Sequence, residues 1–427
     1  MQESFLHYIW QMQYFSKVDL QTTKGEIIEI LDTGTLNANY GPDFDCARIK
    51  ISGVEWVGNV EIHTASSSWN SHKHNLDKGY NNVILHIVWE DDKPISRNDG
   101  SQIPTLELKN RVDESLLKTY QQFVKSSLPI PCQPKILSVR KITTLSMQER
   151  ALIQRLERKA EEVNQLVEKN GNDWEETTYQ LLCRNFGFKV NAEPFFQLSR
   201  ALPLKIIRKH VDKGYQIEAL LFGLAGFLKS SKGDEYYLLL KNEYDMLERK
   251  YELKKMQMTE SQWRFLRLRP PNFPTLRLAQ WSALLCKTQY IFSSIIKSKN
   301  IKSLTELFSV SPSQYWLSHY QFSKLSNDRI HNLGKSSIEN IVINTVVPIW
   351  VAYGKLLDEE DYIECSIKTL QSIPHEKNRI INKWSNTGIW IKSAFDSQSL
   401  IELYNEFCSK KRCLSCHIGS ALIRPKS

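Results

Sequence analysis

The stretch that decides the fold of the N-terminal region reads GPDFDCARIKISGVEWVGNVEIH, residues 41–63. Within it, residues 46–52 and 54–63 are short runs rich in β-branched side chains, which predicts two β-strands. The connection between them, SGVE at 52–55, is short enough for a tight turn, so the two strands should form an antiparallel hairpin. This hairpin is the centre from which the rest of the region can be assigned.

Further strands and a helix flank the hairpin. Residues 25–31, 82–90 and 104–109 show the same short pattern, bounded by Gly, Asn, Asp or Pro. Residues 2–15 carry apolar side chains at the spacing of a short helix. The order is therefore α–β–β–β with more strand following. Three prolines between residues 126 and 135 indicate a joint after this module.

Beyond the prolines the pattern becomes helical. Ser146 and Glu149 have the spacing of a capping box at the start of the first long helix, and Asp173 opens the next. Helices are expected at residues 146–171, 173–187, 202–212, 215–228, 235–256, 275–288, 336–354, 358–371, 376–385 and 397–408. We therefore predict an α+β protein, in which a restriction-endonuclease-like α/β module (residues 1–130) precedes a mostly α-helical domain (residues 131–427).

Composition and charge limit the class of protein. The 427 residues are 41% hydrophobic and 24% charged, which is typical of a globular chain. The longest apolar run, residues 219–228, is far shorter than a membrane span, and the first 15 residues lack the features of a signal peptide. We therefore expect a cytoplasmic protein without a membrane segment, whose eight cysteines are thiols or metal ligands. The net charge of +9 permits a nucleic-acid partner without requiring one.

Asp43, Glu61 and His63 form the first candidate site. Glu61 and His63 are two residues apart on a predicted strand and should point to one face, while Asp43 precedes the partner strand. Adjacent strands lie about 5 Å apart, so the two carboxylates are within reach of one divalent cation. Paired carboxylates suit Mg²⁺ or Mn²⁺, which activate a bound water molecule, and His63 would lie beside that water.

This pattern resembles the PD-(D/E)xK nuclease superfamily, whose α–β–β–β–α–β core carries an Asp on one strand and (D/E)-x-K on the next. In this chain Asp43 follows a proline, residues 61–63 read EIH, and Glu3 on the leading helix would be the additional acid that some members use. His63 stands where the superfamily has lysine. A neutral imidazole can orient or deprotonate water, but it carries no permanent positive charge. The resemblance implies a metal-dependent nuclease.

Histidines suggest a second metal chemistry at the same place. Four of the ten histidines fall within 24 residues: His63, His72, His74 and His86. If the polar segment 66–80 folds over the strands, His72 and His74 could join the carboxylates in binding zinc or manganese. Loop histidines are more often solvated, His86 also suits a strand core, and Asp43 after Gly-Pro is a typical turn residue. The sequence therefore leaves open an interpretation without a metal.

The C-terminal segment, CSKKRCLSCHIGSALIRPKS, contains the second candidate site. Cys408, Cys413 and Cys416 have a spacing that suits a metal, and a fourth ligand would be His417 or a distant thiol such as Cys132 or Cys183. Zinc and an iron–sulfur cluster are both compatible with these ligands, and small buried residues without a metal are the alternative. Residues 408–427 also hold five basic residues and no acidic one, which suits contacts with phosphate.

Residues 263–277, WRFLRLRPPNFPTLR, place basic side chains among aromatics and prolines. The candidate nucleic-acid-binding residues are Arg264, Arg267, Arg269 and Arg277. Guanidinium groups bind phosphates and aromatic faces stack on bases, so this stretch suits a nucleic-acid interface. The alternative is a connection whose aromatics pack in the core while its arginines pair with carboxylates such as Glu260.

Over the whole chain, seven motifs resemble a bacterial family described only as a domain of unknown function: GPDF, GNVEIH, SSSWNSHKH, NVILHIVWE, RPPNFPTLR, NTVVPIWVAYG and RCLSCHIG. That resemblance brings no activity, so function rests on the sites themselves. We expect a metal-dependent nuclease. The alternatives are a non-catalytic nucleic-acid-binding or scaffold protein with a decayed nuclease core and a structural zinc, and a metal hydrolase of a small phosphorylated molecule.

Overall fold

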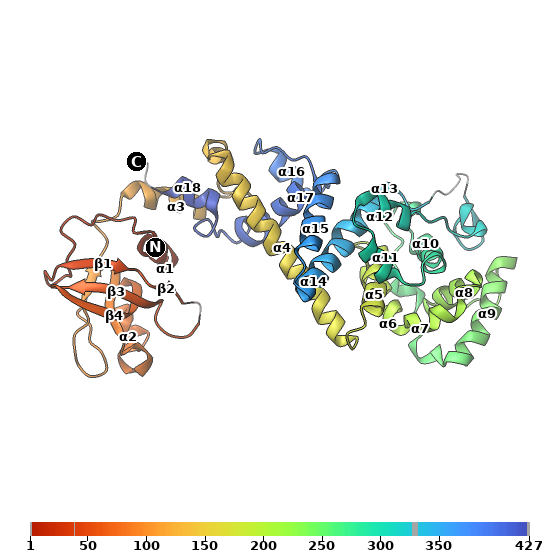
Figure 1. The fold of residues 1–427 in the computed structure, drawn as a ribbon, viewed down its shortest axis with the longest axis horizontal. Helices are drawn as coiled ribbons and strands as arrows, with labels where there is room; N and C mark the ends of the chain where they lie inside the picture. The colour runs from red at the N-terminus through yellow and green to blue at the C-terminus, as the bar shows by residue number, and fades with distance from the viewer. Residues whose placement is uncertain (1, 38, 327–331, 425–427) are drawn as a thin grey trace. The chain divides into compact units, whose positions relative to one another are not determined.

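The computed structural model describes residues 2–37, 39–326 and 332–424, and the chain forms two compact units. The first unit comprises Met1–Glu149, Asn382–Ile389 and Ile401–Ser427, and the second comprises Arg150–Ile381 and Trp390–Leu400. A mixed β-sheet lies in the first unit and the second is largely helical (Figure 1), which confirms the predicted α+β class. Residues 131–149 and the C-terminal cysteine segment, which the sequence assigns to the helical domain, belong to the first compact unit.

The sheet of the first unit is built from short strands in the order β1-β3-β4-β5-β6, with β2 also paired to β3. Their bounds are β1 (Ile28–Asp32), β2 (Thr35–Leu36), β3 (Phe44–Ile51), β4 (Val54–Ala65), β5 (Val83–Glu90) and β6 (Thr105–Glu107). The predicted β3–β4 hairpin is present, and its turn residues Ser52 and Gly53 have φ of 50° and 85°. Positive φ at both turn positions matches the twist of the strands. β4 pairs with β5 in parallel, as does β5 with β6, so the sheet is mixed.

A β-bulge in β3 sets which face of the sheet each side chain reaches. Phe44 pairs with Val60, but Ala47 pairs with Gly58, so one extra residue lies between these two pairs. From Ala47 to Ile51 the odd-numbered residues are buried, yet the even-numbered Phe44 is buried with them. Extending the Phe44–Val60 register by one residue puts Asp43 opposite Glu61. The bulge thus moves Asp43 to the face of Glu61, whereas strict alternation would have left it on the apolar face.

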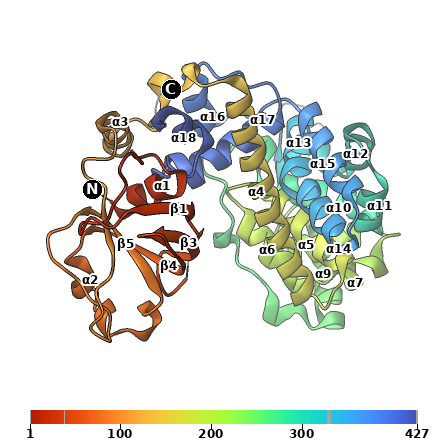
Figure 2. The ribbon, with the colours of Figure 1, turned by 60° about the vertical axis from the view of Figure 1, so that its left-hand side comes forward.

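The first unit also contains helices and turns. They are α1 (Glu3–Met12), α2 (Ser68–Ser71), η1 (His74–Leu76), η2 (Lys78–Tyr80), α3 (Glu114–Lys125), η3 (Gln133–Ser138), the π-helical η10 (Leu403–Cys408) and α18 (His417–Ile423). α1 buries Phe5, Leu6, Ile9 and Trp10 and packs against β4, as does α2. Figure 2 shows α1 beside the strands in the red part of the ribbon. The chain therefore returns to this unit at its C-terminal end, where α18 packs on α3.

The second unit is a helical assembly around one large apolar core. Its elements are α4 (Lys141–Lys169, which begins in the first unit), α5 (Trp174–Phe186), α6 (Ala192–Ala201), α7 (Leu204–Ile207), α8 (Gly214–Leu224), α9 (Glu235–Tyr251), α10 (Pro274–Lys287), α11 (Ile291–Lys297), α12 (Ile301–Phe308), the hairpin β7 (His319–Gln321) and β8 (Lys324–Leu325), α13 (Lys335–Ile341), the π-helical η9 (Val342–Val346), α14 (Val347–Leu357), α15 (Glu360–Ser372), α16 (Arg379–Ser385) and α17 (Ala394–Glu402), the last two of which end in the first unit. The sequence did not predict α6, α11 and α12, which are short.

Two predicted helix starts have different outcomes. Asp173 caps α5 as expected, because its carboxylate accepts the backbone N–H of Glu176 at 3.0 Å. The capping box at Ser146 is wrong, since α4 begins at Lys141 and Ser146 lies inside the helix. The Ser146 hydroxyl instead lies 3.4 Å from Nδ1 of His417.

One helical stretch, Lys335–Leu357, is long and apolar enough to cross a membrane by length and composition. It spans α13, η9 and α14, and 67% of its most apolar window is buried inside the protein. Such burial is typical of the core helix of a soluble protein.

Candidate metal centre

Asp43 and Glu61 meet at the start of β3 through a reciprocal pair of hydrogen bonds. The backbone N–H of Asp43 donates to Glu61 Oε2 at 3.1 Å, and the backbone N–H of Ile62 donates to Asp43 Oδ2 at 2.9 Å. Each carboxylate is thus positioned by the backbone of the other strand. This arrangement follows from the bulge, which places both side chains on one face of the sheet.

The second oxygen of Glu61 faces imidazole rings. Glu61 Oε1 lies 3.5 Å from His63 Nε2 and 3.4 Å from His74 Nε2, and His63 Nε2 lies 3.1 Å from His72 Nδ1. Ligands about 2.0–2.1 Å from a tetrahedral ion are separated by roughly 3.3–3.5 Å. Each of these three contacts therefore has the spacing of two neighbouring ligands on one metal ion.

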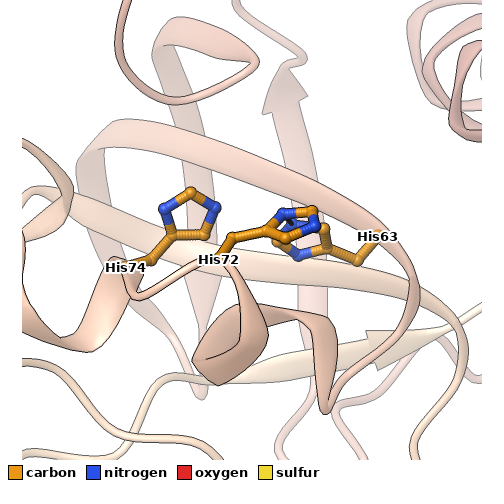
Figure 3. A group of neighbouring side chains, drawn as sticks. All are labelled: His63, His72 and His74. Atoms are coloured by element: carbon orange, nitrogen blue, oxygen red, sulfur yellow. Dashed lines mark hydrogen bonds between the residues drawn. The ribbon is translucent and has the colours of Figure 1, made fainter.

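His63, His72 and His74 are the centre of this cluster. One ligand atom from each lies within 4.8 Å of those of the other two. Figure 3 shows that His63 comes from the strand while His72 and His74 come from the segment that follows α2. His63 is buried and His72 is exposed, so the cluster connects the protein interior with solvent.

His63 is held by its neighbours on both ring nitrogens. Its side chain is 2% exposed, and Nδ1 lies 2.8 Å from Nε2 of His86. A ligating nitrogen must be unprotonated, so binding through Nε2 would leave the proton on Nδ1, which then donates to His86. This environment suits a metal ligand, whereas the role expected from the sequence is to orient or deprotonate a metal-bound water. The strand register pairs His86 with Glu61. From there His86 accepts the hydrogen bond from His63 Nδ1 and so orients the His63 ring.

Aromatic packing explains why the segment after β4 folds over the sheet. Trp69 in α2 is fully buried, and its ring lies 5.4 Å from His74 and 5.5 Å from His86. The rings of His74 and Tyr80 stack at 3.9 Å. The Asp77 carboxylate accepts the N–H of Gly79 at 2.8 Å, which starts η2. The burial of Trp69 thus brings His72 and His74 to the strand.

Burial controls the ionisation of these groups. The pKa of Glu61 is raised to about 9 by burial and by the neighbouring charges of Asp43 and Glu3. Burial, together with the other histidines, lowers the pKa of His63 to about 3, and burial lowers the pKa of His86 to about 3 as well. Without a cation, Glu61 is protonated and His63 is neutral at pH 7. A metal ion that binds here would displace the proton of Glu61. It would displace no proton from the His63 imidazole, which is already neutral.

Glu61→Gln should stabilise the metal-free protein at alkaline pH. The unfolded Glu61 ionises near its ordinary pKa of 4.5 and the folded one near 9, so between these values the folded state holds one more proton. The free energy of unfolding therefore falls as pH rises through this window. We expect the variant to remove this fall and to gain on the order of 2 kcal/mol at pH 8, measured by urea unfolding with a chelator.

The matched control for this measurement is Glu29→Gln, since Glu29 is an exposed carboxylate on β1 that pairs with Lys50. Its free energy of unfolding should change by less than about 0.5 kcal/mol and keep the wild-type dependence on pH. An unchanged pH dependence in Glu61→Gln would contradict a buried, protonated Glu61.

His7 is a site residue that the sequence did not identify. It lies on α1 with Nε2 3.3 Å from Asp43 Oδ2, and its side chain is 24% exposed. Glu3, one helical turn earlier, is close enough to raise the pKa of Glu61. The signal was available, because Glu3 and His7 are four residues apart and therefore share a helix face. α1 thus contributes an acid and an imidazole to the site.

The structure also brings together the predicted cysteines Cys132, Cys408, Cys413 and Cys416, which are all buried in the first unit. Cys183 lies elsewhere, in α5, where its thiol donates to the carbonyl of Phe195 at 3.2 Å. All eight cysteines, which the described residues include, are free thiols.

The arginine-rich stretch divides into exposed and buried residues. Arg264, Arg267 and Arg269 are exposed, whereas Trp263 is buried and donates its indole N–H to the carbonyl of Ala225 at 2.8 Å. Phe265 packs against the core of the second unit. Trp263 and Phe265 therefore serve the core, as the alternative expected of the aromatics, while the three arginines and Leu266 face solvent.

Arg277 is in a different environment, inside α10. Its side chain donates to Gln280 at 2.9 Å and to Ser337 at 3.1 Å, and its guanidinium lies 4.5 Å from the ring centre of Phe188. Only 5% of the residue is exposed. In this conformation its guanidinium stabilises the helical core and does not reach a phosphate.

A cavity of about 840 Å³ in the second unit is lined by basic side chains that the sequence did not single out. They are Lys159, Lys169, Arg184 and Lys189. Lys159 donates to Asn344 in η9 at 3.2 Å, and burial lowers its pKa to about 8. π-Helical turns such as η9 are frequent at functional sites. Glu162 also lines the cavity, and the excess of basic over acidic groups suits an anionic ligand.

Comparison with known proteins identifies the family of this chain. A family model described as "Protein of unknown function (DUF2851)" matches residues 3–379, so the chain belongs to that family. The match includes every residue of the carboxylate–histidine site and Cys132. No curated protein and no solved structure matches the chain.

Proposed function

We propose that this member of the DUF2851 family is a metal-dependent hydrolase of phosphodiesters, with nucleic acid as its substrate. The observation that carries the proposal is the position of Glu61, whose Oε2 is fixed by the backbone of Asp43 while Oε1 faces His63 and His74. The buried Glu61 carboxylate is thus paired with Asp43 through one oxygen and faces the imidazoles through the other. The mixed sheet, with Asp43 directly before β3 and Glu61 on the adjacent β4, is consistent with the resemblance to PD-(D/E)xK nucleases.

The donor set favours a transition-metal ion. His63, His72 and His74 supply nitrogen ligands and Glu61 an oxygen, and imidazole suits zinc and similar ions better than magnesium. A divalent ion there would supply an activated water and neutralise charge on a phosphate. Mn²⁺, which accepts both donor types, is the second candidate, and Mg²⁺ is disfavoured by the three imidazoles.

Besides the exposed His72, Asp43 and His7 are partly accessible groups of the site. The side chains of Asp43 and His7 are 25% and 24% exposed, whereas those of Glu61 and His63 are 6% and 2% exposed. An imidazole can act as a general acid or base when it lies beside the reacting groups. We assign to His7 the transfer of a proton to or from water or the leaving group. We assign to Asp43 the orientation of the His7 ring.

Charge supports nucleic acid as the substrate. The chain carries a net charge of +9, and Arg264, Arg267 and Arg269 are exposed in the second unit. The cavity lined by Lys159, Lys169, Arg184 and Lys189 adds a second basic feature to the same unit. The helical unit would therefore bind the phosphate backbone. Free thiols at all eight cysteines are consistent with a cytoplasmic location.

The test is a cleavage assay on metal-free protein to which Zn²⁺, Mn²⁺ or Mg²⁺ is returned singly. Single- and double-stranded DNA and RNA are the substrates, with a phosphodiester ester of p-nitrophenol as a small-molecule arm. We expect cleavage of nucleic acid with Zn²⁺ or Mn²⁺ and none with a chelator. Binding without cleavage under every metal would instead identify a non-catalytic binding protein, and cleavage of the small ester alone would identify a hydrolase of small phosphorylated molecules.

A further inference from the structure

The four buried thiols of the first unit form a cluster separate from the carboxylate–histidine site. Cys132 precedes η3, Cys408 ends η10, and Cys413 and Cys416 precede α18, each with 7% exposure. The pKa of Cys132 is raised to about 12 by burial and by the charges of Cys416 and Cys413. Burial and the charges of the other three thiols raise the pKa of Cys408 as well. The four cysteines come from two distant parts of the chain that belong to the same compact unit.

The chain turns back immediately after Cys408 to bring the next two thiols toward it. The N–H of Lys411 donates to the carbonyl of Cys408 at 3.2 Å, and the N–H of Arg412 donates to that of Phe407 at 2.9 Å. Lys411 has a positive φ of 55°. Residues 409–412 are all polar or basic, so no apolar side chain of the turn provides a reason for it.

The next turn is held just as closely. The N–H of Cys416 donates to the carbonyl of Cys413 at 3.3 Å, and Gly419 in α18 packs on the backbone of Cys413. A Cβ at position 419 would approach the carbonyl oxygen of Cys413 to 2.2 Å, so only glycine fits. Cys413 and Cys416 are therefore fixed at the start of α18.

Contacts within the first unit hold this segment near Cys132. The Lys411 ammonium donates to the carbonyl of Ser126, and Tyr8 in α1 lies 2.8 Å from the hydroxyl of Ser420. α18 packs on α3, beside which it lies in Figure 1. Segments far apart in the sequence are thus assembled around four thiols. Apolar packing alone would be satisfied by any small residue, so four cysteines at this place point to a shared ligand.

We propose that Cys132, Cys408, Cys413 and Cys416 bind an iron–sulfur cluster. The spacing C-x₄-C-x₂-C with one remote cysteine is used by iron–sulfur ligands. The spacing of the thiols also favours a cluster over one zinc ion. Thiolates about 2.3 Å from a tetrahedral zinc are roughly 3.8 Å apart. No three of these four thiols, which all belong to described residues, lie mutually within 4.8 Å. A cluster accommodates that spacing, because its thiolates bind different iron atoms.

The test is metal and sulfide analysis of the full-length protein, purified without oxygen or chelator. We expect about two or four iron atoms and as many sulfides per chain, with the brown colour of a cluster. Cys132→Ser and Cys413→Ser should each lose nearly all of the iron. The matched control is Cys46→Ser, which removes an exposed thiol from β3 of the same unit and should keep the iron.

Two measurements keep the proposal testable if a variant fails to fold. Wild-type protein stripped by a chelator should regain iron and colour when ferrous iron and sulfide are supplied, and circular dichroism reports the folding of each variant. About one zinc per chain, lost in the cysteine variants and retained when His72 and His74 are replaced by alanine, would overturn the cluster in favour of a single ion. Neither metal at stoichiometric level, before or after reconstitution, would overturn the site altogether.

Discussion

Glu61→Gln and Asp43→Asn are each expected to reduce metal-dependent cleavage by on the order of 10³-fold. Glutamine keeps the shape of Glu61 and the hydrogen bond from the Asp43 backbone, but it removes the charge that faces His63 and His74. Asparagine likewise preserves the acceptor for the N–H of Ile62 while removing the negative charge at the accessible end of the site. Initial rates over a range of metal concentrations would separate lost metal affinity from lost turnover.

The control for this experiment is Glu55→Gln on the same strand. Glu55 is an exposed partner of Arg48 at 2.7 Å, outside the site, so its loss should change the rate by less than about twofold. Because Glu61→Gln is expected to stabilise the metal-free fold, a loss of activity there is not explained by unfolding. Cleavage at the wild-type rate in both Glu61→Gln and Asp43→Asn would show that this site does not catalyse the cleavage.

His63→Lys separates two roles for His63. A residue that substitutes for the lysine of PD-(D/E)xK nucleases should tolerate lysine and retain cleavage. A metal ligand buried between His72 and His86 should not, because a buried ammonium would oppose the metal and is costly to desolvate. We expect loss of both activity and metal binding, measured by cleavage and by titration calorimetry. Retained activity in His63→Lys would show that His63 takes the role of the nuclease lysine and is not a metal ligand.

Zn²⁺ added to metal-free protein should raise the unfolding temperature of the first unit by roughly 5–10 °C. A ligand at 100 times its dissociation constant stabilises the folded state by about 2.7 kcal/mol, and 1 kcal/mol shifts the midpoint by about 2–4 °C in a domain of this size. His72→Ala and His74→Ala should lose most of the shift, because each removes one ligand of the cluster. Calorimetry at pH 7.5 with Zn²⁺, Mn²⁺ and Mg²⁺ tests the expected order, with Mg²⁺ weakest.

His375→Ala is the control for the thermal shift, since His375 lies in the second unit, and the cysteines are left intact in every variant. A full shift in His72→Ala and His74→Ala would exclude the imidazole cluster as the binding site. Stabilisation by Mg²⁺ that depends on Asp43 and Glu61 alone would instead support the paired-carboxylate site.

The sequence predicted much of the fold because local signals agreed with the final structure. The β3–β4 hairpin follows from two short strands with a Ser-Gly turn, and α5 begins at Asp173, whose side chain caps it. The predicted start of α4 was wrong, because Ser146 and Glu149 have the spacing of a cap although the helix begins five residues earlier, at Lys141. Local patterns locate elements well and their boundaries less well.

The candidate site was predicted in part. Asp43, Glu61 and His63 were identified by residue type and spacing, and Glu3 by resemblance to a nuclease core. His7 was missed, although its spacing from Glu3 was available. The role of His72 and His74 could not be decided, because loop histidines are usually solvated and only the buried Trp69 folds their segment over the sheet.

The sequence by itself determined the α+β class, the hairpin and the residue types that gather near its end. Only the tertiary structure decided that these residues meet. Strict alternation places Asp43 with Ala47 and Ile49, and the bulge in β3 reverses its face toward Glu61. A bulge depends on pairing between strands, and the approach of Cys132 to Cys408 depends on the packing of α18 on α3. Neither relation is encoded in local periodicity, because both come from contacts between segments that lie apart in the chain.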